Sequence, residues 1–318
     1  MLEIVFLGTG GAVPSPRRHL AAIWMRYSSE EGESFLMDCG EGTQLQLMKA
    51  GLSFMQLDRI FITHWHADHW AGLIGLIQTM NLEGRKTPLR VYGPEAERFV
   101  DLILELGYWA PRFRVIPVDV PFEGDQETVV YQHPQFRIVS RPAKHSVPAV
   151  MYAFQEQDKV NVDIQKAAAL GLTQGRVVGA LKAEGKVVVR GRTVTLEEVG
   201  VRKPGLKAVY TGDTQACPQL VALARGADLL IHDSTYEAQE EDVMHAGAKE
   251  AAAAAKEAGV GTLVLTHFSR RYQDVSPLEQ EARQVFPRVL SAKDFLKLTL
   301  KKGSLDVGDA RPPRDKAA

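Results

Sequence analysis

The feature that most constrains this chain is the segment DRIFITHWHADHW, residues 58–70, in which four metal-ligand side chains fall within six positions. They are His64, His66, Asp68 and His69, and they follow an apolar stretch typical of a buried β-strand. A turn at the end of a strand directs several side chains to one point, which is what a zinc ion requires of its ligands. A single histidine in such a turn is commonly structural, but four ligand-type residues together predict a metal site.

Three more candidate ligands follow other apolar runs. His145 follows FRIVSRPAK, Asp213 follows KAVYTG and His267 follows GTLVLT. Open α/β sheets place their sites at the carboxyl ends of strands, so we expect these residues to join the first cluster. The combined set exceeds the needs of one tetrahedral zinc and suffices for two if a carboxylate bridges them. Asp213 suits the bridge because a carboxylate has two oxygens, whereas imidazole offers one available nitrogen.

The pattern of apolar residues predicts the fold class. β-Branched runs ending in polar or glycine-rich turns predict strands at residues 2–7, 34–37, 58–63, 136–140, 207–211, 228–231 and 261–265. Helical spacing links Trp70 to Met80, and the alanine-rich residues 247–259 favour a second helix closed by a glycine. We therefore expect a layered α/β catalytic domain over residues 1–302. Residues 303–318 are polar with paired prolines, and we expect them to be a disordered tail.

The stretch from about 155 to 206 breaks this alternation and is rich in Gly, Lys and Arg. Residues 159–207 hold ten basic and four acidic side chains, a net charge of +6, so the rest of a chain of net charge −1 carries −7. A basic segment on an acidic body favours a local contact with a polyanion, and a solvated surface loop without a partner is the alternative. We expect an arm that extends from the body.

Composition excludes several other classes of protein. The chain is 45% hydrophobic and 24% charged, which is ordinary for a globular protein. Its N-terminus lacks a signal-peptide pattern, and no apolar run approaches the roughly 20 residues that span a bilayer, so we expect a soluble protein that is not exported. Cys39 and Cys217 are the only cysteines, and neither lies in a C-x-x-C pair. This excludes a disulfide scaffold and favours the cytoplasm.

The ligand spacing and several other segments resemble a known family. His-x-His-x-Asp-His is the signature of the metallo-β-lactamase superfamily, and four further segments resemble ribonuclease Z, the tRNA 3′-processing endonuclease: FLGTGGAVPSPRR, MDCGEGTQLQL, YTGDT and LTHFSRRY. The resemblance covers roughly residues 1–300 and implies a four-layer αβ/βα sandwich with a protruding basic arm. It also implies hydrolysis of precursor tRNA after the discriminator nucleotide, which removes the 3′ trailer and leaves a 3′-hydroxyl.

The resemblance also implies cofactors, roles and assembly. Two Zn²⁺ ions per subunit would be held, one by His64, His66, His145 and Asp213, the other by Asp68, His69, Asp213 and His267. Asp68 would accept the proton of the attacking water, and His245, oriented by the acid Asp233, would support the leaving ribose oxygen. Substrate contacts are expected from Ser269, Arg271, Arg176 and Lys182. The family is implied to be a homodimer in which one subunit's arm serves the partner's active site, and no other protein partner or membrane is implied.

The chain departs from the family pattern at three places. Asp233 stands where a glutamate is expected, and because it is one methylene shorter we expect a looser or water-mediated contact with His245. The sequence His245-Ala246-Gly247 replaces His-Ser-Thr, and Gly175-Arg176 replaces a Gly-Pro pair in the arm. Asp233 would favour protonated His245 whereas a helix N-terminus would disfavour it, and the sequence leaves this balance open.

Two alternatives of different kinds remain at this point. A hydrolase of small phosphodiesters, thioesters or lactams would share the fold and the metal ligands, although the basic segment and His245 argue against it. A non-catalytic RNA-binding module would keep zinc for folding, but structural zinc closes its coordination shell and favours cysteine. A diiron oxygen reductase fits less well, because that relative places Glu where His66 stands. The identity of the metal also stays open, since Zn, Mn and Fe all accept these ligands.

Overall fold

The computed structural model describes residues 1–28, 32–106, 108–172, 175–189, 191–237 and 244–311. The chain forms two compact units, the larger from Met1–Gln155 with Leu206–Ala318 and the smaller from Glu156–Gly205. The smaller unit contains most of the basic segment, and the larger one contains the candidate ligands. Each unit has a hydrophobic core of its own.

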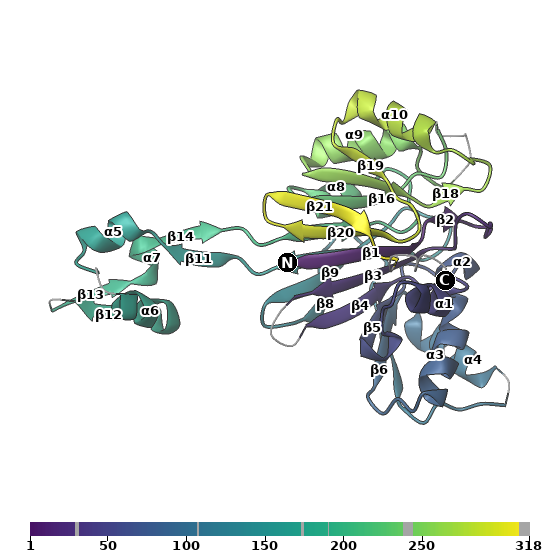
Figure 1. Cartoon of the computed structure of the whole chain (residues 1–318), viewed down its shortest axis with the longest axis horizontal. Coiled ribbons are helices and arrows are strands. Elements are labelled where there is room, and N and C mark those ends of the chain that lie inside the picture. The colour runs from purple at the N-terminus through teal and green to yellow at the C-terminus, as the bar shows by residue number, and fades with distance from the viewer. Residues whose placement is uncertain (29–31, 107, 173–174, 190, 238–243, 312–318) are drawn as a thin grey trace, which may run out of the picture. The chain divides into compact units, whose positions relative to one another are not determined.

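Two sheets form the centre of the larger unit (Figure 1). Within the described residues the first has the order β21 (Ser304–Asp309), β20 (Leu296–Lys301), β1 (Leu2–Gly8), β3 (Ala22–Tyr27), β4 (Glu33–Met37), β5 (Leu57–Phe61), β6 (Leu89–Gly93) and β7 (Val115–Asp119). The second has the order β19 (Val289–Ser291), β17 (Thr262–Thr266), β16 (Leu229–Asp233), β15 (Lys207–Tyr210), β10 (Val150–Glu156), β9 (Phe136–Pro142) and β8 (Thr128–Gln132). Strands β4 to β7 pair in parallel, as do β15, β16, β17 and β19, so these carboxyl ends share one edge of each sheet.

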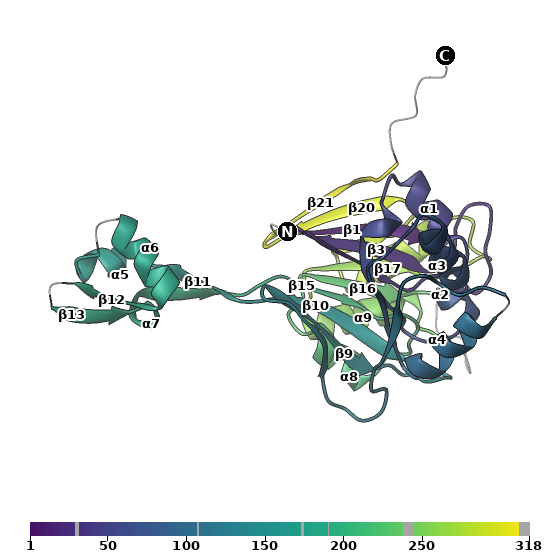
Figure 2. The same ribbon diagram turned by 90° about the horizontal axis from the view of Figure 1, so that it is seen from below.

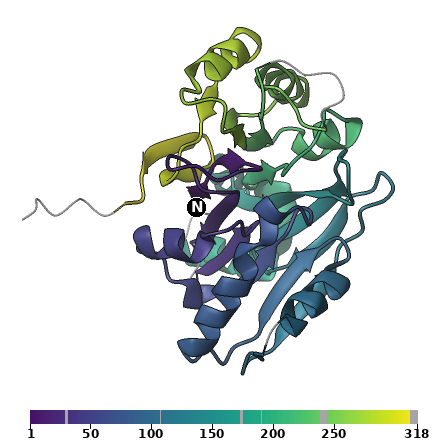
Figure 3. The ribbon, with the colours of Figure 1, turned by 90° about the vertical axis from the view of Figure 1, so that its right-hand side faces the viewer.

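Helices cover the outer face of each sheet, while the inner faces pack on each other. Phe6, Phe35, Phe61 and Tyr152 belong to the core between the sheets. One helical layer contains α1 (Thr43–Lys49), α3 (Gly72–Leu82) and α4 (Ala96–Glu105), and the other contains α8 (Pro218–Ala224), α9 (Ala248–Ala258) and α10 (Ser276–Val285). Figure 3 shows both layers outside the sheets. This arrangement is the predicted four-layer αβ/βα sandwich.

Every strand and helix predicted from the sequence is present. Helix α9 shows why the alanine-rich run was informative, because six of its alanines are buried and allow a close approach to the sheet. The helix ends at Ala258 and is capped by Gly259 in the left-handed conformation, as the sequence indicates. Among the described helices, none is both long and apolar enough to cross a lipid bilayer.

The prediction that residues 303–318 are a disordered tail is wrong for the first half of this segment. Residues 304–309 form β21, an edge strand that pairs with β20 in antiparallel register from Lys301↔Ser304 to Leu296↔Asp309. Gly303, the second residue of the two-residue connection between β20 and β21, has φ 81°, which glycine adopts without strain, and Leu305 packs on the core. Strand β21 exposes most of its side chains, so its polar sequence does not show the apolar pattern from which a strand is predicted. Residues 312–318 lie outside the described part of the chain.

The smaller unit is a small α/β module (Figure 2). Its strands pair in two hairpin-like ladders, β11 (Lys159–Val162) with β14 (Gly200–Lys203) and β12 (Lys186–Val189) with β13 (Arg192–Thr195). Helices α5 (Ile164–Ala169), α6 (Gly175–Glu184) and α7 (Leu196–Val199) complete it, with a core formed by Ala167, Leu172, Leu181, Val194 and Val199. Asp163 caps α5 by accepting hydrogen bonds from the amides of Gln165 and Lys166.

Candidate metal centre

The candidate ligands lie on loops that leave the carboxyl ends of strands, as predicted. His64 and His66 follow β5 and lie just before the short helix α2 (Ala67–Trp70), which carries Asp68 and His69. His145 follows β9, Asp213 follows β15 and His267 follows β17, and these strands belong to the other sheet. Ligands from both sheets therefore meet at one end of the sandwich.

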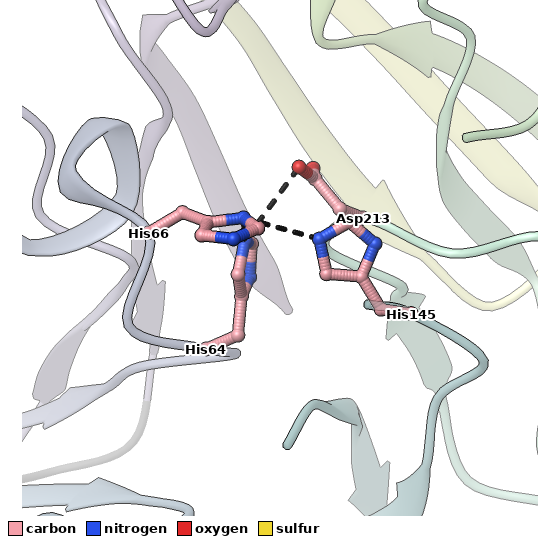
Figure 4. Close-up of side chains that lie close together, drawn as sticks. All are labelled: His64, His66, His145 and Asp213. Atoms are coloured by element: carbon pink, nitrogen blue, oxygen red, sulfur yellow. Dashed lines mark hydrogen bonds and ion pairs between the residues drawn. The ribbon is translucent and has the colours of Figure 1, made fainter. Parts of the chain in front are cut away.

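The first ligand set contains His64, His66, His145 and Asp213 (Figure 4). The Nδ1 atom of His66 lies 3.1 Å from Nε2 of His64 and 3.1 Å from Nε2 of His145. The Oδ2 atom of Asp213 lies 3.7 Å from Nε2 of His64. Three imidazole nitrogens and one carboxylate oxygen thus lie within 4.8 Å of one another, and four such donors are the number that a tetrahedral zinc ion takes.

The second ligand set contains Asp68, His69, Asp213 and His267, all of them buried. The Nε2 atoms of His69 and His267 are 3.3 Å apart, and Oδ2 of Asp68 lies 3.6 Å from the first and 3.2 Å from the second. Oδ1 of Asp213 lies 3.3 Å from Nε2 of His69 and 3.2 Å from Nε2 of His267. A second group of four donors therefore surrounds a second point.

Asp213 belongs to both sets, with Oδ2 facing His64 and Oδ1 facing the second group. Its Oδ1 atom is buried and accepts no well-formed hydrogen bond from any residue the structure describes. An orphaned carboxylate oxygen costs free energy in a protein interior unless a cation satisfies it. The position of Oδ1 between two imidazoles fits a metal ligand, and Asp213 would then be the ligand that the two sets share.

Other groups fix the imidazoles by their second nitrogens. Nδ1 of His69 lies 2.7 Å from Oδ2 of Asp38, and Nδ1 of His145 donates to the Met244 carbonyl at 2.9 Å. For His64 and His267 the partner is a hydroxyl group. The Thr63 hydroxyl lies 3.1 Å from Nδ1 of His64, and the Thr235 hydroxyl lies 3.0 Å from Nδ1 of His267. These contacts aim each Nε2 at the centre, as the outer partners of metal-bound histidines do.

The pKa values of the imidazoles are lowered at two histidines of the first ligand set and raised at both histidines of the second. Burial lowers the pKa of His64 well below its ordinary value and also lowers the pKa of His145, so both offer a free lone pair. Burial opposes the charged form of His69 and His267 too, but the Asp213 carboxylate outweighs it. The pKa of His69 is raised well above its ordinary value and that of His267 to about 10. The buried carboxylates therefore attract positive charge, which protons or metal cations supply.

Asp68 is held as an ionised carboxylate. The backbone N–H of Ala12 donates to its Oδ2 atom at 2.7 Å. Burial favours the neutral acid, but the hydrogen bond from His267 and the charges of His69 and His267 keep the pKa of Asp68 well below its usual range. Asp68 is therefore ionised, the form in which a carboxylate binds a metal ion.

His245 and Asp233 make direct contact, which corrects the expectation of a looser or water-mediated one. Nδ1 of His245 lies 3.0 Å from Oδ2 of Asp233, although the acid is one methylene shorter than glutamate. Tyr236 and Gly247, which lie close to this pair in the sequence, form an isolated β-bridge. A third grouping of ligand-type atoms joins this pair to Asp213 and His267, but here the two partners already contact each other.

The charge balance at His245, which the sequence leaves open, favours the proton. Burial lowers the pKa of this imidazole, but the hydrogen bond and the charge of Asp233 outweigh burial and raise it. Asp233 itself is buried, yet hydrogen bonds from His245 and His267 lower its pKa to about 2. The contact with Asp233 therefore favours the imidazolium form of His245, whose side chain is 20% exposed.

The expected substrate-binding residues lie outside this cluster. Ser269 is partly buried two residues after the candidate ligand His267. Arg271 is exposed, with its guanidinium 4.5 Å from the centre of the Tyr236 ring. Arg176 and Lys182 are exposed side chains of α6 in the smaller unit. Their contacts with a substrate stay predictions.

Sequence reasoning missed several supporting groups. The hydroxyls of Thr63 and Thr235 and the carbonyl of Met244 contact ligands, and only the proximity of the threonines to ligand motifs offered a signal. The Ala12 amide gave no signal, because its position depends on a left-handed φ of 58°. Asp38 and His267 are also left-handed, with φ 55° and 61°. Non-glycine residues in this conformation are strained and cluster at functional sites.

Comparison with known sequences extends over nearly the whole chain. It is 42% identical to "Ribonuclease Z" of Methanothermobacter thermautotrophicus over 95% of this chain and 97% of that protein. It is 38% identical to "Ribonuclease Z" of Brevibacillus brevis over 98% of this chain and 99% of that protein. Two family profiles match parts of the chain, "Anti-Pycsar protein Apyc1" at residues 2–101 and "Beta-lactamase superfamily domain" at residues 159–268.

Solved structures agree with the sequence relatives. Human tRNase Z, short form, is 28% identical with a TM-score of 0.67, and the match covers 94% of this chain and 99% of that one. The metallo-β-lactamase fold protein YhfI from Bacillus subtilis has a TM-score of 0.65 over 93% and 99% of the two chains. At 22% identity this second likeness shows the fold alone.

Proposed function

Because the chain belongs to the ribonuclease Z family, we infer that it is a metal-dependent endoribonuclease that removes the 3′ trailer from precursor tRNA. The reaction is hydrolysis after the discriminator nucleotide, which leaves a 3′-hydroxyl on the tRNA. The observation that carries this inference is the pair of ligand sets joined at Asp213, in a chain that its relatives match from end to end.

We propose that two Zn²⁺ ions occupy the centre of each subunit, one in each ligand set. The donors are imidazole and carboxylate, which suit zinc, and the orphaned Oδ1 of Asp213 supports a shared ligand. When bound, such a pair lowers the pKa of a water molecule towards neutrality and offsets the charge that develops on phosphorus. The residues of this chain must then position the substrate and move two protons.

Asp68 is the proposed acceptor of the first proton. Its carboxylate is ionised and is fixed by the Ala12 amide at 2.7 Å, so it is ready to take a proton from the attacking water. His245 is the proposed donor of the second. As the bond between phosphorus and the ribose O3′ breaks, protonated His245 gives its proton to O3′, and Asp233 at 3.0 Å stabilises the imidazolium beforehand.

We propose that the smaller unit, Glu156–Gly205, is an arm that contacts tRNA. Basic side chains are exposed on it, including Arg176, Lys182 and Lys186, and phosphate contacts of this kind recognise RNA by its shape.

We also propose that the protein is a homodimer in which the arm of one subunit serves the active site of the other. Cys39 and Cys217 are both unpaired, which fits a protein of the cytoplasm.

The test is cleavage of a 3′-extended precursor tRNA by the purified protein, before and after chelation and after zinc is added back. We expect chelation to abolish cleavage and zinc to restore it, with close to two equivalents of zinc bound per chain by elemental analysis. Cleavage that persists in a fully metal-depleted protein would contradict the proposed centre.

A further inference from the structure

The loop from Thr9 to His19 carries the amide that holds Asp68. It connects β1 to β3 and includes the two-residue strand β2 (Gly10–Gly11), which pairs with β18 (Phe268–Ser269). The Gly10 amide donates to the His19 carbonyl at 2.9 Å, so the loop closes on itself. From this closed loop the Ala12 amide reaches Asp68 Oδ2 at 2.7 Å.

One carboxylate joins both ends of this loop. Asp294, between β19 and β20, accepts a hydrogen bond from the Thr9 hydroxyl on Oδ1 at 2.8 Å and from the His19 amide on Oδ2 at 2.8 Å. Nδ1 of His19 lies 3.2 Å from the same Oδ2 atom. The Asp294 side chain is only 9% exposed, so these contacts are largely protected from water.

Arg18 reinforces the closure from the other side. Its guanidinium donates to the Thr9 hydroxyl at 2.7 Å and to the Ala292 carbonyl at 2.9 Å. The same group lies 4.6 Å from the centre of the Phe268 ring, beside the ligand His267. Thr9 therefore links Arg18 to Asp294, and the loop is tied to the segment that follows β17.

The closure matters because Ala12 is strained. Its φ of 58° lies in the left-handed region, which a residue with a Cβ adopts only where the surrounding structure imposes it. Ala12 is exposed, so its own side chain does not hold it there. The constraint comes from the contacts of the loop, namely the pairing of Gly10–Gly11 with β18 and the two loop ends that Asp294 contacts.

We propose that Asp294 is a positioning residue for the hydrolytic reaction. By closing the loop from Thr9 to His19, it keeps the Ala12 amide on Asp68 and so fixes the carboxylate that takes the proton from water. The inference rests on the proposed role of Asp68. It places the effect of Asp294 on the chemical step and not on the binding of tRNA.

The experiment compares Asp294→Asn with the wild type on two substrates, precursor tRNA and bis(p-nitrophenyl) phosphate. We expect kcat to fall by about 10- to 100-fold on both, the range typical for outer partners of metal ligands, while KM and the zinc content stay unchanged. The matched control is Asp228→Asn. Asp228 likewise accepts a backbone amide, from Lys207 at 2.9 Å, and contacts Lys302 Nζ at 2.9 Å, but it lies at the opposite end of β16. Its kcat should stay within about twofold of wild type, because the substitution lies far from the centre.

A second variant keeps the inference testable if Asp294→Asn does not fold. Thr9→Val removes the hydroxyl that donates to Asp294 and should reproduce the kcat loss on both substrates. The double variant should lose no more than the worse single one, because both act through one contact. A fall in kcat on precursor tRNA alone would show that the loop contacts RNA. An unchanged kcat on both substrates would show that Asp294 does not help to position Asp68. Either result overturns the inference. A wild type that hydrolyses neither substrate would instead contradict the proposed function.

Discussion

Among single residues, Asp213 is the one on which both ligand sets depend. Its two oxygens face different groups of imidazoles, so Asp213→Asn removes charge from both sets and replaces one of the two oxygens with an amide nitrogen. Substitution of outer partners alone costs about 10- to 100-fold in metal affinity, and we expect a larger loss here. Elemental analysis of the purified variant should find less than one zinc per chain. Two retained zinc ions would show that Asp213 is not shared.

His245 determines the expected pH dependence of the reaction. Its proposed role requires the protonated imidazole, so activity should fall as the pH rises through its pKa, which Asp233 raises. Asp233→Asn removes that charge and lowers the pKa of His245. The basic limb of the kcat/KM profile should therefore move to lower pH by about 1–3 units, the usual effect of an adjacent opposite charge. A basic limb that stays in place would assign it to another group.

The elements around the centre explain why glycine is required at Gly11 in β2. A Cβ built there would lie 2.4 Å from Cε1 of His267, too close for the ring to keep its place. We expect Gly11→Ala to reduce kcat by on the order of 10²-fold, because a ligand displaced by about 1 Å loses its catalytic geometry. Gly308→Ala in β21 is the control, since nothing lies within 4 Å of its Cβ position. Equal kcat values for the two variants would contradict the role of Gly11.

The same elements show what sequence predicts well and what it does not. Strands with continuous apolar runs, such as β1 and β17, and the alanine-rich α9 were predicted because their local pattern agrees with their packing. Strand β21 was missed because it is a mostly exposed edge with a polar sequence. The candidate ligand residues could be selected from the sequence because their types and spacing are chemically specific, and the structure brings them together. The contacts of Ala12 and Asp294 were not, since they join segments far apart in the chain through backbone atoms and a left-handed residue.

For the whole molecule, the division into two units predicts separable functions. Because Lys159 pairs with Lys203 across β11 and β14, residues 160–200 can be replaced by a short Gly-Ser link. This deletion should weaken cleavage of precursor tRNA by at least about 10-fold through lost phosphate contacts and spare hydrolysis of bis(p-nitrophenyl) phosphate. Equal loss on both substrates would remove the argument that the arm binds tRNA.

The proposed homodimer makes a further prediction. If one subunit's arm serves the partner's centre, the arm deletion and Asp68→Ala are defective in different parts of the same assembly. Mixing and re-associating the two defective proteins should restore up to about a quarter of wild-type tRNA cleavage, because a mixed dimer holds one intact arm and one intact centre in the required combination. Each protein refolded alone is the control. If mass analysis detects mixed dimers but cleavage is not restored, each active site must use the arm of its own subunit.

The measurement that tests the central claim most directly is a map of the cut in an end-labelled precursor tRNA at nucleotide resolution. Asp68→Ala and a chelated sample serve as controls. We predict one cut after the discriminator nucleotide, with a 3′-hydroxyl on the tRNA and a 5′-phosphate on the trailer, absent in both controls. An intact precursor, under conditions in which the same protein hydrolyses bis(p-nitrophenyl) phosphate, would contradict the account and restrict the enzyme to small phosphodiesters.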